Sequence, residues 1–187
     1  MAKQILVIGA GRSSTSLIDY LLANASSEGW FITVGDVSKQ TVLAKTKQHP
    51  LSRAIAFDVN NAQQRESEID KADIVVSLLP ASMHYNVAKD CVRLKKHMAT
   101  ASYVSKEIAG LDAAARKSGL ILLNELGLDP GLDHMSAMKL INEIKNVAVE
   151  NRVPLLAKLV NFNLPSVQET TEDSKLSRKI LCGTCEF

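Results

Sequence analysis

Apolar runs of strand length alternate with longer amphipathic stretches over residues 3–123, and this alternation restricts the fold more than any other feature of the chain. The pattern predicts strands at residues 3–8, 31–35, 54–57, 73–79, 97–100 and 120–123. It predicts helices between them, at residues 13–24, 38–47, 62–71, 82–95 and 105–117. Alternating strands and helices form a parallel sheet covered on both faces. Right-handed crossovers then favour a doubly wound α/β arrangement, the Rossmann fold.

The pattern changes after residue 124. The stretch ELGLDPGLDH carries glycines, a proline and acidic residues, which predict a loop. A helix is expected to follow at about 133–145, with three inward-facing side chains, Met135, Met138 and Ile141. We therefore expect two domains, a dinucleotide-binding domain at 1–125 and, at 126–187, a linker helix with an incomplete or altered substrate domain.

The composition is that of a soluble globular protein, with 46% hydrophobic residues, 22% charged residues and a net charge of +2. The basic residues are scattered, which argues against nucleic-acid binding, and no apolar run is long enough to span a membrane. The chain begins directly with a strand pattern, so we expect a cytoplasmic protein without a leader. Three cysteines fit a reducing compartment. Cys182 and Cys185 form at most half of a zinc site, so we expect no metal.

The stretch ILVIGAGRSSTSLIDYLL near the N-terminus reads as a strand, a glycine turn and a helix. In a dinucleotide-binding turn the first glycine permits the bend, and the second lets the pyrophosphate approach the backbone. Gly9 and Gly11 occupy these positions, and Ser14 is a small residue where the fingerprint has its third glycine. Arg12 belongs to the same turn, and Ser13 and Ser14 are expected to cap the helix and leave N–H groups free for phosphate. The alternative is a glycine turn that binds no ligand.

Asp36 is expected at the end of the second strand, where a carboxylate can accept hydrogen bonds from the ribose hydroxyls of adenosine. A carboxylate there repels a 2′-phosphate, so the sequence predicts NAD in preference to NADP, although Lys39 and Arg12 could weaken this preference. The alternative is that Asp36 caps the next helix, a role for which Ser38 is better suited.

The other strand ends meet at the same edge of the sheet, where open α/β sheets bind their ligands. Asp58 and Val59 follow the third strand and are expected to bracket adenine. Leu78 and Leu79 end the fourth strand on the nicotinamide side, and Ser102 follows the fifth. For the two leucines, the alternative is that their side chains lie in the core and only their backbone lines the cleft.

Three further segments, SLLPASMHYNVAKDCV, TASYVS and NELGLDPGLDHMSAMKLI, carry a likeness to a known family. From about residue 4 to about residue 145 the chain resembles the saccharopine dehydrogenase family, most closely its glutamate-forming branch. The resemblance implies that the LLP and SY segments reach cofactor and substrate, with four candidate substrate residues, Pro80, Ser102, Tyr103 and Asp129. It leaves the catalytic acid–base group unassigned. His84 and His134 are further candidates, with ordinary packed or exposed histidines as the alternative.

The reaction implied by the resemblance belongs to lysine metabolism. Hydride leaves the lysine ε-carbon of saccharopine for the nicotinamide, and water splits the resulting imine into glutamate and aminoadipate semialdehyde. The expected partners are a small amino-acid substrate and further copies of the chain in a homo-oligomer. Two alternatives stay open: a dehydrogenase of a related secondary amine, of the carboxyspermidine type, and a nucleotide-binding module without turnover. Because the sequence after residue 146 departs from the family pattern, we also expect little activity from this chain. A truncated or frame-altered gene is the simplest cause, and a genuine short relative is the alternative.

Overall fold

The structure is a computed structural model and describes residues 2–150, with side chains up to residue 145. The chain divides into two compact units, Met1–Gly127 and Leu128–Phe187. The first unit carries a sheet, and the second carries the long helix α7 (Leu132–Glu150). No helix within residues 2–150 combines the length and the apolar character needed to cross a bilayer.

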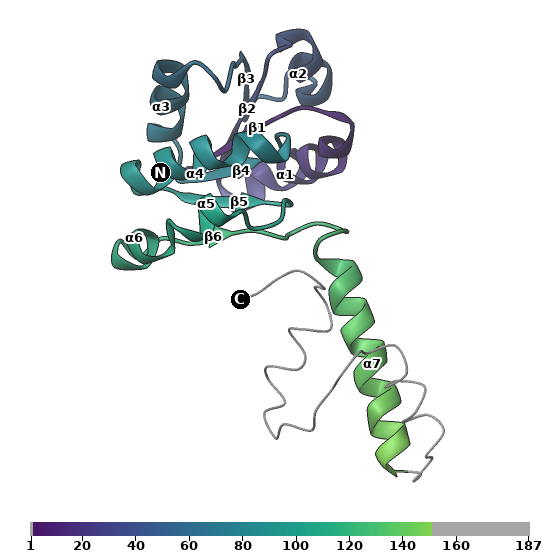
Figure 1. The fold of residues 1–187 in the computed structure, drawn as a ribbon. Helices are drawn as coiled ribbons and strands as arrows, with labels where there is room; N and C mark the ends of the chain where they lie inside the picture. The colour runs from purple at the N-terminus through teal and green to yellow at the C-terminus, as the bar shows by residue number, and fades with distance from the viewer. Residues whose placement is uncertain (1, 151–187) are drawn as a thin grey trace. The chain divides into compact units, whose positions relative to one another are not determined.

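A parallel sheet of six strands forms the centre of the first unit (Figure 1). In chain order the strands are β1 (Lys3–Ile8), β2 (Trp30–Asp36), β3 (Ser52–Ala56), β4 (Ile74–Ser77), β5 (His97–Thr100) and β6 (Leu122–Leu123). Their order across the sheet is β3-β2-β1-β4-β5-β6, and every neighbouring pair is parallel. The predicted doubly wound α/β fold is therefore confirmed, and the winding changes direction between β1 and β4.

The helices of the first unit are α1 (Thr15–Glu28), α2 (Lys39–Thr46), α3 (Ala62–Asp70), α4 (His84–Leu94), α5 (Lys106–Ala109) and α6 (Asp112–Lys117). Short 3₁₀ turns, Arg12–Ser14 and Ala81–Met83, precede α1 and α4. The single helix expected at 105–117 is divided around Leu111, because the N–H of Leu111 closes a tighter turn onto the carbonyl of Ile108. The helix α1 ends at Gly29, which adopts a left-handed φ of 67°.

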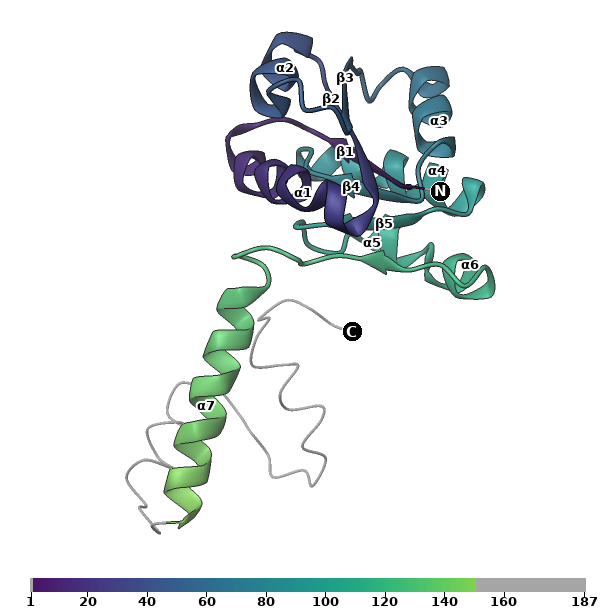
Figure 2. The same ribbon diagram turned by 180° about the vertical axis from the view of Figure 1, so that it is seen from behind.

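Two apolar clusters lie on opposite faces of the sheet, and β1 contributes to both. Leu6 and Ile8 pack with residues of α3, α4 and α5, whereas Ile5 and Val7 pack with residues of α1 and α2. Such alternation follows from the geometry of a strand, whose successive side chains point to opposite faces. Figures 1 and 2 show the two faces, with α4 toward the viewer in the first and α1 toward the viewer in the second.

In the second unit, α7 presents large apolar side chains to solvent. Leu132, Met135 and Leu140 are 56%, 62% and 58% exposed. The expectation that Met135 faces inward is therefore wrong, because it shares a helix face with the exposed Leu132, three residues before it. Met138 and Ile141 are half-buried. Cys182 and Cys185 lie outside the described residues.

Candidate functional site

The residues expected to bind a nucleotide follow the carboxyl ends of successive strands. The segments are 9–14 after β1, Asp36 at the end of β2, 58–59 after β3, 78–80 after β4 and 102–103 after β5. Because the strands are parallel, these segments share one edge of the sheet. The chain leaves the neighbours β1 and β4 toward opposite sides of the sheet, and open α/β sheets bind ligands at such a switch point.

Gly9 begins the glycine turn, which we define as residues 9–14. Its φ is 106°, and its N–H donates to the carbonyl of Gly35 at 2.8 Å. A Cβ at this position would lie 2.7 Å from the carbonyl oxygen of Leu78, so the end of β4 leaves no room for a side chain. Both the backbone conformation and the close approach therefore require glycine.

The backbone amides of Gly11, Arg12 and Ser13, which come after Ala10, are open to a ligand. A Cβ at Gly11 would meet nothing within 4 Å, so the protein itself leaves this space unfilled. Gly11, Arg12 and Ser13 are exposed, and within residues 2–150 their backbone N–H groups donate to no protein acceptor. Free N–H groups just before α1, next to a space that a side chain would fill, fit the pyrophosphate of a dinucleotide.

Ser14 is fully buried, which explains why the third position of the fingerprint accepts only a small residue. Its hydroxyl donates to the carbonyl of Gly11 at 2.8 Å. Within the described chain neither Ser13 nor Ser14 caps α1 with its side chain, so the expected caps are wrong. The reason is the 3₁₀ turn, in which the Ser14 N–H also donates to the carbonyl of Gly11 and brings the hydroxyl to the same acceptor.

Asp36 directs its carboxylate toward the glycine turn. Oδ2 accepts the N–H of Ala10 at 2.7 Å, and Oδ1 accepts the N–H of Ser38 at 3.1 Å. The hydroxyl of Ser38 accepts the N–H of Thr41 at 3.3 Å and so caps α2. Asp36 therefore connects the glycine turn with the start of α2, while Ser38 is the cap of that helix.

The loop after β3 is fastened by its own polar groups. The N–H of Asp58 donates to the side-chain oxygen of Gln64 at 3.0 Å, and the Asp58 carboxylate accepts the N–H of Asn60 at 2.9 Å. Asp58 is exposed, whereas the Val59 side chain is 6% exposed and belongs to the core. Of the two residues expected to bracket adenine, Asp58 thus offers its side chain and Val59 only its backbone.

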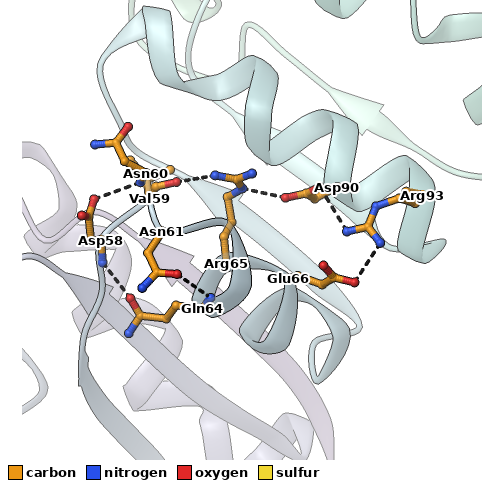
Figure 3. Close-up of polar contacts among 9 residues, drawn as sticks. All are labelled: Asp58, Val59, Asn60, Asn61, Gln64, Arg65, Glu66, Asp90 and Arg93. Atoms are coloured by element: carbon orange, nitrogen blue, oxygen red, sulfur yellow. Dashed lines mark hydrogen bonds and ion pairs between the residues drawn. The ribbon is translucent and has the colours of Figure 1, made fainter.

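A buried ion pair supports the same loop, and local sequence patterns gave no sign of it. Arg65 on α3 donates to Asp90 on α4 at 2.6 Å and also to the carbonyl of Val59 (Figure 3). Asp90 accepts a second hydrogen bond from Arg93 at 3.3 Å, and Arg93 pairs with Glu66 at 2.8 Å. The side chains of Arg65 and Asp90 are each only 11% exposed, so water screens their attraction little.

The end of β4 divides its side chains between the two faces. Leu78 packs against the cluster of α1 and α2, and Leu79 packs against the cluster of α3, α4 and α5. Both are half-buried, so the core alternative holds for their side chains. The N–H of Leu78 donates to the carbonyl of Ile8 at 2.8 Å, and the exposed Pro80 follows.

His84, at the start of α4, is packed in the core. Its side chain is 2% exposed, and Nδ1 lies 2.8 Å from the hydroxyl of Ser77 and 3.5 Å from that of Thr100. Burial lowers the pKa of the imidazole below its ordinary value of 6.5, although a hydrogen bond with the backbone of Leu79 opposes this shift. A neutral His84 therefore links the ends of β4 and β5 and is poorly placed to exchange protons with a ligand.

The TASYVS segment after β5 and residues 124–126 after β6 lie side by side. The N–H of Glu125 donates to the carbonyl of Ser102 at 3.0 Å, and the N–H of Leu126 donates to the carbonyl of Thr100 at 3.2 Å. The N–H of Val104 donates to the Glu125 carboxylate at 3.3 Å. Ser102 is half-buried, and Tyr103 is 49% exposed.

Asp129 belongs to the second unit, where it lies near Asp133 and His134. One ligand atom from each of the three residues lies within 4.8 Å of the others. His134 Nδ1 is 2.8 Å from the Asp133 carboxylate, and this pairing accounts for the closeness of two of the three groups.

Comparison with known proteins identifies the family. The family described as "Saccharopine dehydrogenase NADP binding domain" matches residues 5–123, from β1 to β6. The chain belongs to the saccharopine dehydrogenase family. The resemblance stated from the LLP, SY and GLDPG segments is thereby confirmed.

Relatives within the saccharopine dehydrogenase family are much longer than this chain. Alpha-aminoadipic semialdehyde synthase of Arabidopsis thaliana is 38% identical over 156 residues, which cover 74% of this chain and 15% of the relative. The NADP(+)-dependent, L-glutamate-forming saccharopine dehydrogenase of Pyricularia oryzae is 38% identical over 144 residues, which cover 76% and 31%. The apo structure of saccharopine dehydrogenase (L-Glu forming) from Saccharomyces cerevisiae is similar with a TM-score of 0.69 and 33% identity, over 79% of this chain and 32% of that chain.

The predicted preference for NAD over NADP is wrong. The matching saccharopine dehydrogenase family is defined by an NADP-binding domain, and the Pyricularia oryzae relative is named as NADP(+)-dependent. The structure supplies a physical reason, because both oxygens of the Asp36 carboxylate accept backbone N–H groups of the protein itself. This carboxylate is bound to the glycine turn and α2, so its presence at the end of β2 is no guide to the ribose.

Proposed function

We propose that the chain is the NADP-binding part of an oxidoreductase of lysine metabolism that acts on saccharopine and yields glutamate and aminoadipate semialdehyde. The observation that carries the proposal is the open glycine turn, where the N–H groups of Gly11, Arg12 and Ser13 donate to no acceptor among residues 2–150 and lie beside the space at Gly11. Membership of the family and the names of the relatives support the reaction.

The residues of the first unit divide between the parts of the cofactor. Gly9, Gly11, Arg12, Ser13 and Ser14 form the turn for the pyrophosphate, and Asp58 and Val59 border the adenine. Leu78, Leu79 and Ser102 border the nicotinamide, and Pro80, Ser102 and Tyr103 are the candidate substrate residues of this unit. The fourth candidate substrate residue, Asp129, belongs to the second unit. NADP⁺ held there would accept hydride from the substrate carbon that bears the secondary amine. The protein contributes alignment, because hydride transfer needs the substrate carbon and the nicotinamide carbon about 3–3.5 Å apart.

Binding is tested by titration with NADPH, followed by its fluorescence. Gly11→Leu should abolish binding and leave the unfolding midpoint unchanged, because the added side chain enters the open space and touches no protein atom near its Cβ. Ala23→Leu is the matched control, since it adds leucine at an exposed position of α1. Equal NADPH affinity of Gly11→Leu and the unmutated protein would refute the site.

Turnover is tested separately, by saccharopine-dependent formation of NADPH from NADP⁺. Binding of NADPH without turnover of saccharopine would favour a nucleotide-binding module. Turnover of a carboxyspermidine-type amine in place of saccharopine would favour the other dehydrogenase.

We also propose that the chain self-associates, since Leu132, Met135 and Leu140 are exposed on α7. Light scattering on a sizing column tests this, and a monomer at all concentrations would contradict it. A cytoplasmic location stays a prediction, because the semialdehyde synthase of Bos taurus is named as mitochondrial.

A further inference from the structure

Lys45 extends from α2 to the glycine turn, more than thirty residues earlier in the chain. Its ammonium donates to the carbonyl of Gly11, to the hydroxyl of Ser14 at 2.8 Å and to the hydroxyl of Thr15 at 2.9 Å. Three donors meet three neutral oxygens, which is the full hydrogen-bonding capacity of a lysine. Lys45 therefore fixes the turn from the side of α2, as Asp36 fixes it from the end of β2.

The charge of Lys45 lies in a place that is unusual for a cation. The partial positive charge at a helix N-terminus favours anions and disfavours ammonium groups. Within residues 2–145, no carboxylate lies within 4 Å of the Lys45 ammonium, in contrast to Lys47, which pairs with Asp19 at 3.1 Å. The positive charge of Lys45 thus adds to the partial positive charge at the start of α1. It does so beside the N–H groups of Gly11, Arg12 and Ser13, which have no acceptor among residues 2–150.

We infer that Lys45 is a cofactor-positioning residue, which holds the glycine turn in its binding conformation and adds positive charge beside the dinucleotide pyrophosphate. The inference rests on the proposed NADP binding and adds to it a residue outside the fingerprint. The Asp36 carboxylate bonds the turn at Ala10 and forms no ion pair with Lys45, so the phosphate groups of the dinucleotide would be the anions that the Lys45 charge attracts. Lys45 acts through the turn and through its charge, without direct contact with the reacting atoms.

The experiment compares Lys45→Met with Lys47→Met, because both remove one positive charge near the end of α2 and only Lys45 touches the turn. NADPH dissociation constants are measured at low and high ionic strength, and unfolding midpoints are measured without nucleotide. Lys45→Met is expected to bind NADPH roughly tenfold more weakly at low salt, with the gap to the unmutated protein narrowing as salt screens the charge. Lys47→Met is expected to stay within about twofold of the unmutated protein.

The outcomes distinguish an effect of the Lys45 charge on NADPH binding from a purely structural effect of its hydrogen bonds. NADPH binding by Lys45→Met within about twofold of the unmutated protein would overturn the inference, and so would a loss that does not change with salt. If Lys45→Met fails to fold, Lys45→Gln keeps an amide donor for the turn and carries the same expected salt dependence. An unmutated protein that binds no NADPH would overturn the proposed function itself, and this inference with it.

Discussion

The backbone N–H of Ala10 donates a 2.7 Å hydrogen bond to the Oδ2 atom of Asp36. The contact joins the middle of the glycine turn to the end of β2, and the other carboxylate oxygen continues it to Ser38 at the start of α2. An acidic residue at this point can thus serve the conformation of the turn, whatever nucleotide the turn binds.

Replacement of Asp36 by serine should destabilise the protein even without nucleotide. The change removes the acceptor of two backbone N–H groups, and a hydrogen bond to a charged group contributes about 1.5–3 kcal/mol. Because Asp36 is only partly buried, we expect a loss of about 1–2 kcal/mol in the free energy of unfolding, measured with urea. Asp19→Ser is the control, since its surface pair with Lys47 should cost less than about 1 kcal/mol. Equal losses would contradict this role.

Alanine at Gly9 should be far more damaging than alanine at Gly11. The first change forces a side chain into a φ of 106° and within 2.7 Å of the Leu78 carbonyl, and should cost more than about 2 kcal/mol of stability. The second meets no protein atom within 4 Å and should cost less than about 1 kcal/mol. Thermal unfolding of both variants without nucleotide checks the difference. Similar midpoints would show that the end of β4 can move away.

Loss of Arg65 should destabilise the protein by about 2–4 kcal/mol, because it leaves a buried Asp90 with one weaker partner and the Val59 carbonyl without its donor. Arg65→Met is compared with Arg93→Met, which removes a second partner of the same Asp90 without contact to the loop. Because Arg93 is exposed, Arg93→Met should lower the free energy of unfolding much less than Arg65→Met. Urea unfolding measures the free energy of unfolding of both variants. A larger loss in Arg93→Met than in Arg65→Met would show that the contact of Arg65 with the loop contributes little to stability.

The stability of the protein should fall in mild acid through His84. The pKa of His84 in the folded protein lies below its ordinary value of 6.5. Between the folded-state pKa and 6.5, the unfolded chain therefore binds more protons than the folded one. Stability conferred by neutral His84 is therefore fully present above the ordinary pKa and is lost as the pH falls toward the folded-state pKa. His84→Gln should flatten this part of the pH profile of the unfolding free energy. An unchanged slope would assign the acid sensitivity to other groups.

The thiol of Cys91 should be unreactive in the folded protein. Burial raises its pKa to about 12, and the nearby Asp90 carboxylate adds to the shift, so almost no thiolate forms at neutral pH. In a Cys182→Ser, Cys185→Ser background, a thiol reagent such as DTNB should react only after denaturant is added. Rapid reaction of the native protein would mean that the face of the sheet covered by α4 opens readily.

Features with a local period or a fixed spacing could be predicted from the sequence. Every strand carries its own apolar run. The spacing of Gly9 and Gly11 predicts the position of the glycine turn without knowledge of any tertiary contact. The split around Leu111 was missed because α5 and α6 have the same helical composition, and only the backbone bond between Leu111 and Ile108 separates them.

Contacts between distant segments could not be predicted in the same way. Lys45 meets Gly11, and Arg65 meets Asp90, only after the sheet has brought their helices together. The direction of the Asp36 carboxylate is equally a property of the assembled fold. The predicted preference for NAD was wrong for this reason. The sequence shows that an acidic residue ends β2, but it does not show from which N–H groups its carboxylate accepts hydrogen bonds.

The alternation of β1 between two apolar clusters has a thermodynamic consequence. Leu6 and Ile8 belong to one apolar cluster, and Ile5 and Val7 belong to the other. Unfolding of either cluster would therefore expose β1, which the other cluster also contains. The two halves of the first unit should therefore unfold in one cooperative transition, with coincident loss of helical and aromatic circular dichroism signals. Amide protons of β1 should exchange only through that global opening and be among the slowest in the protein.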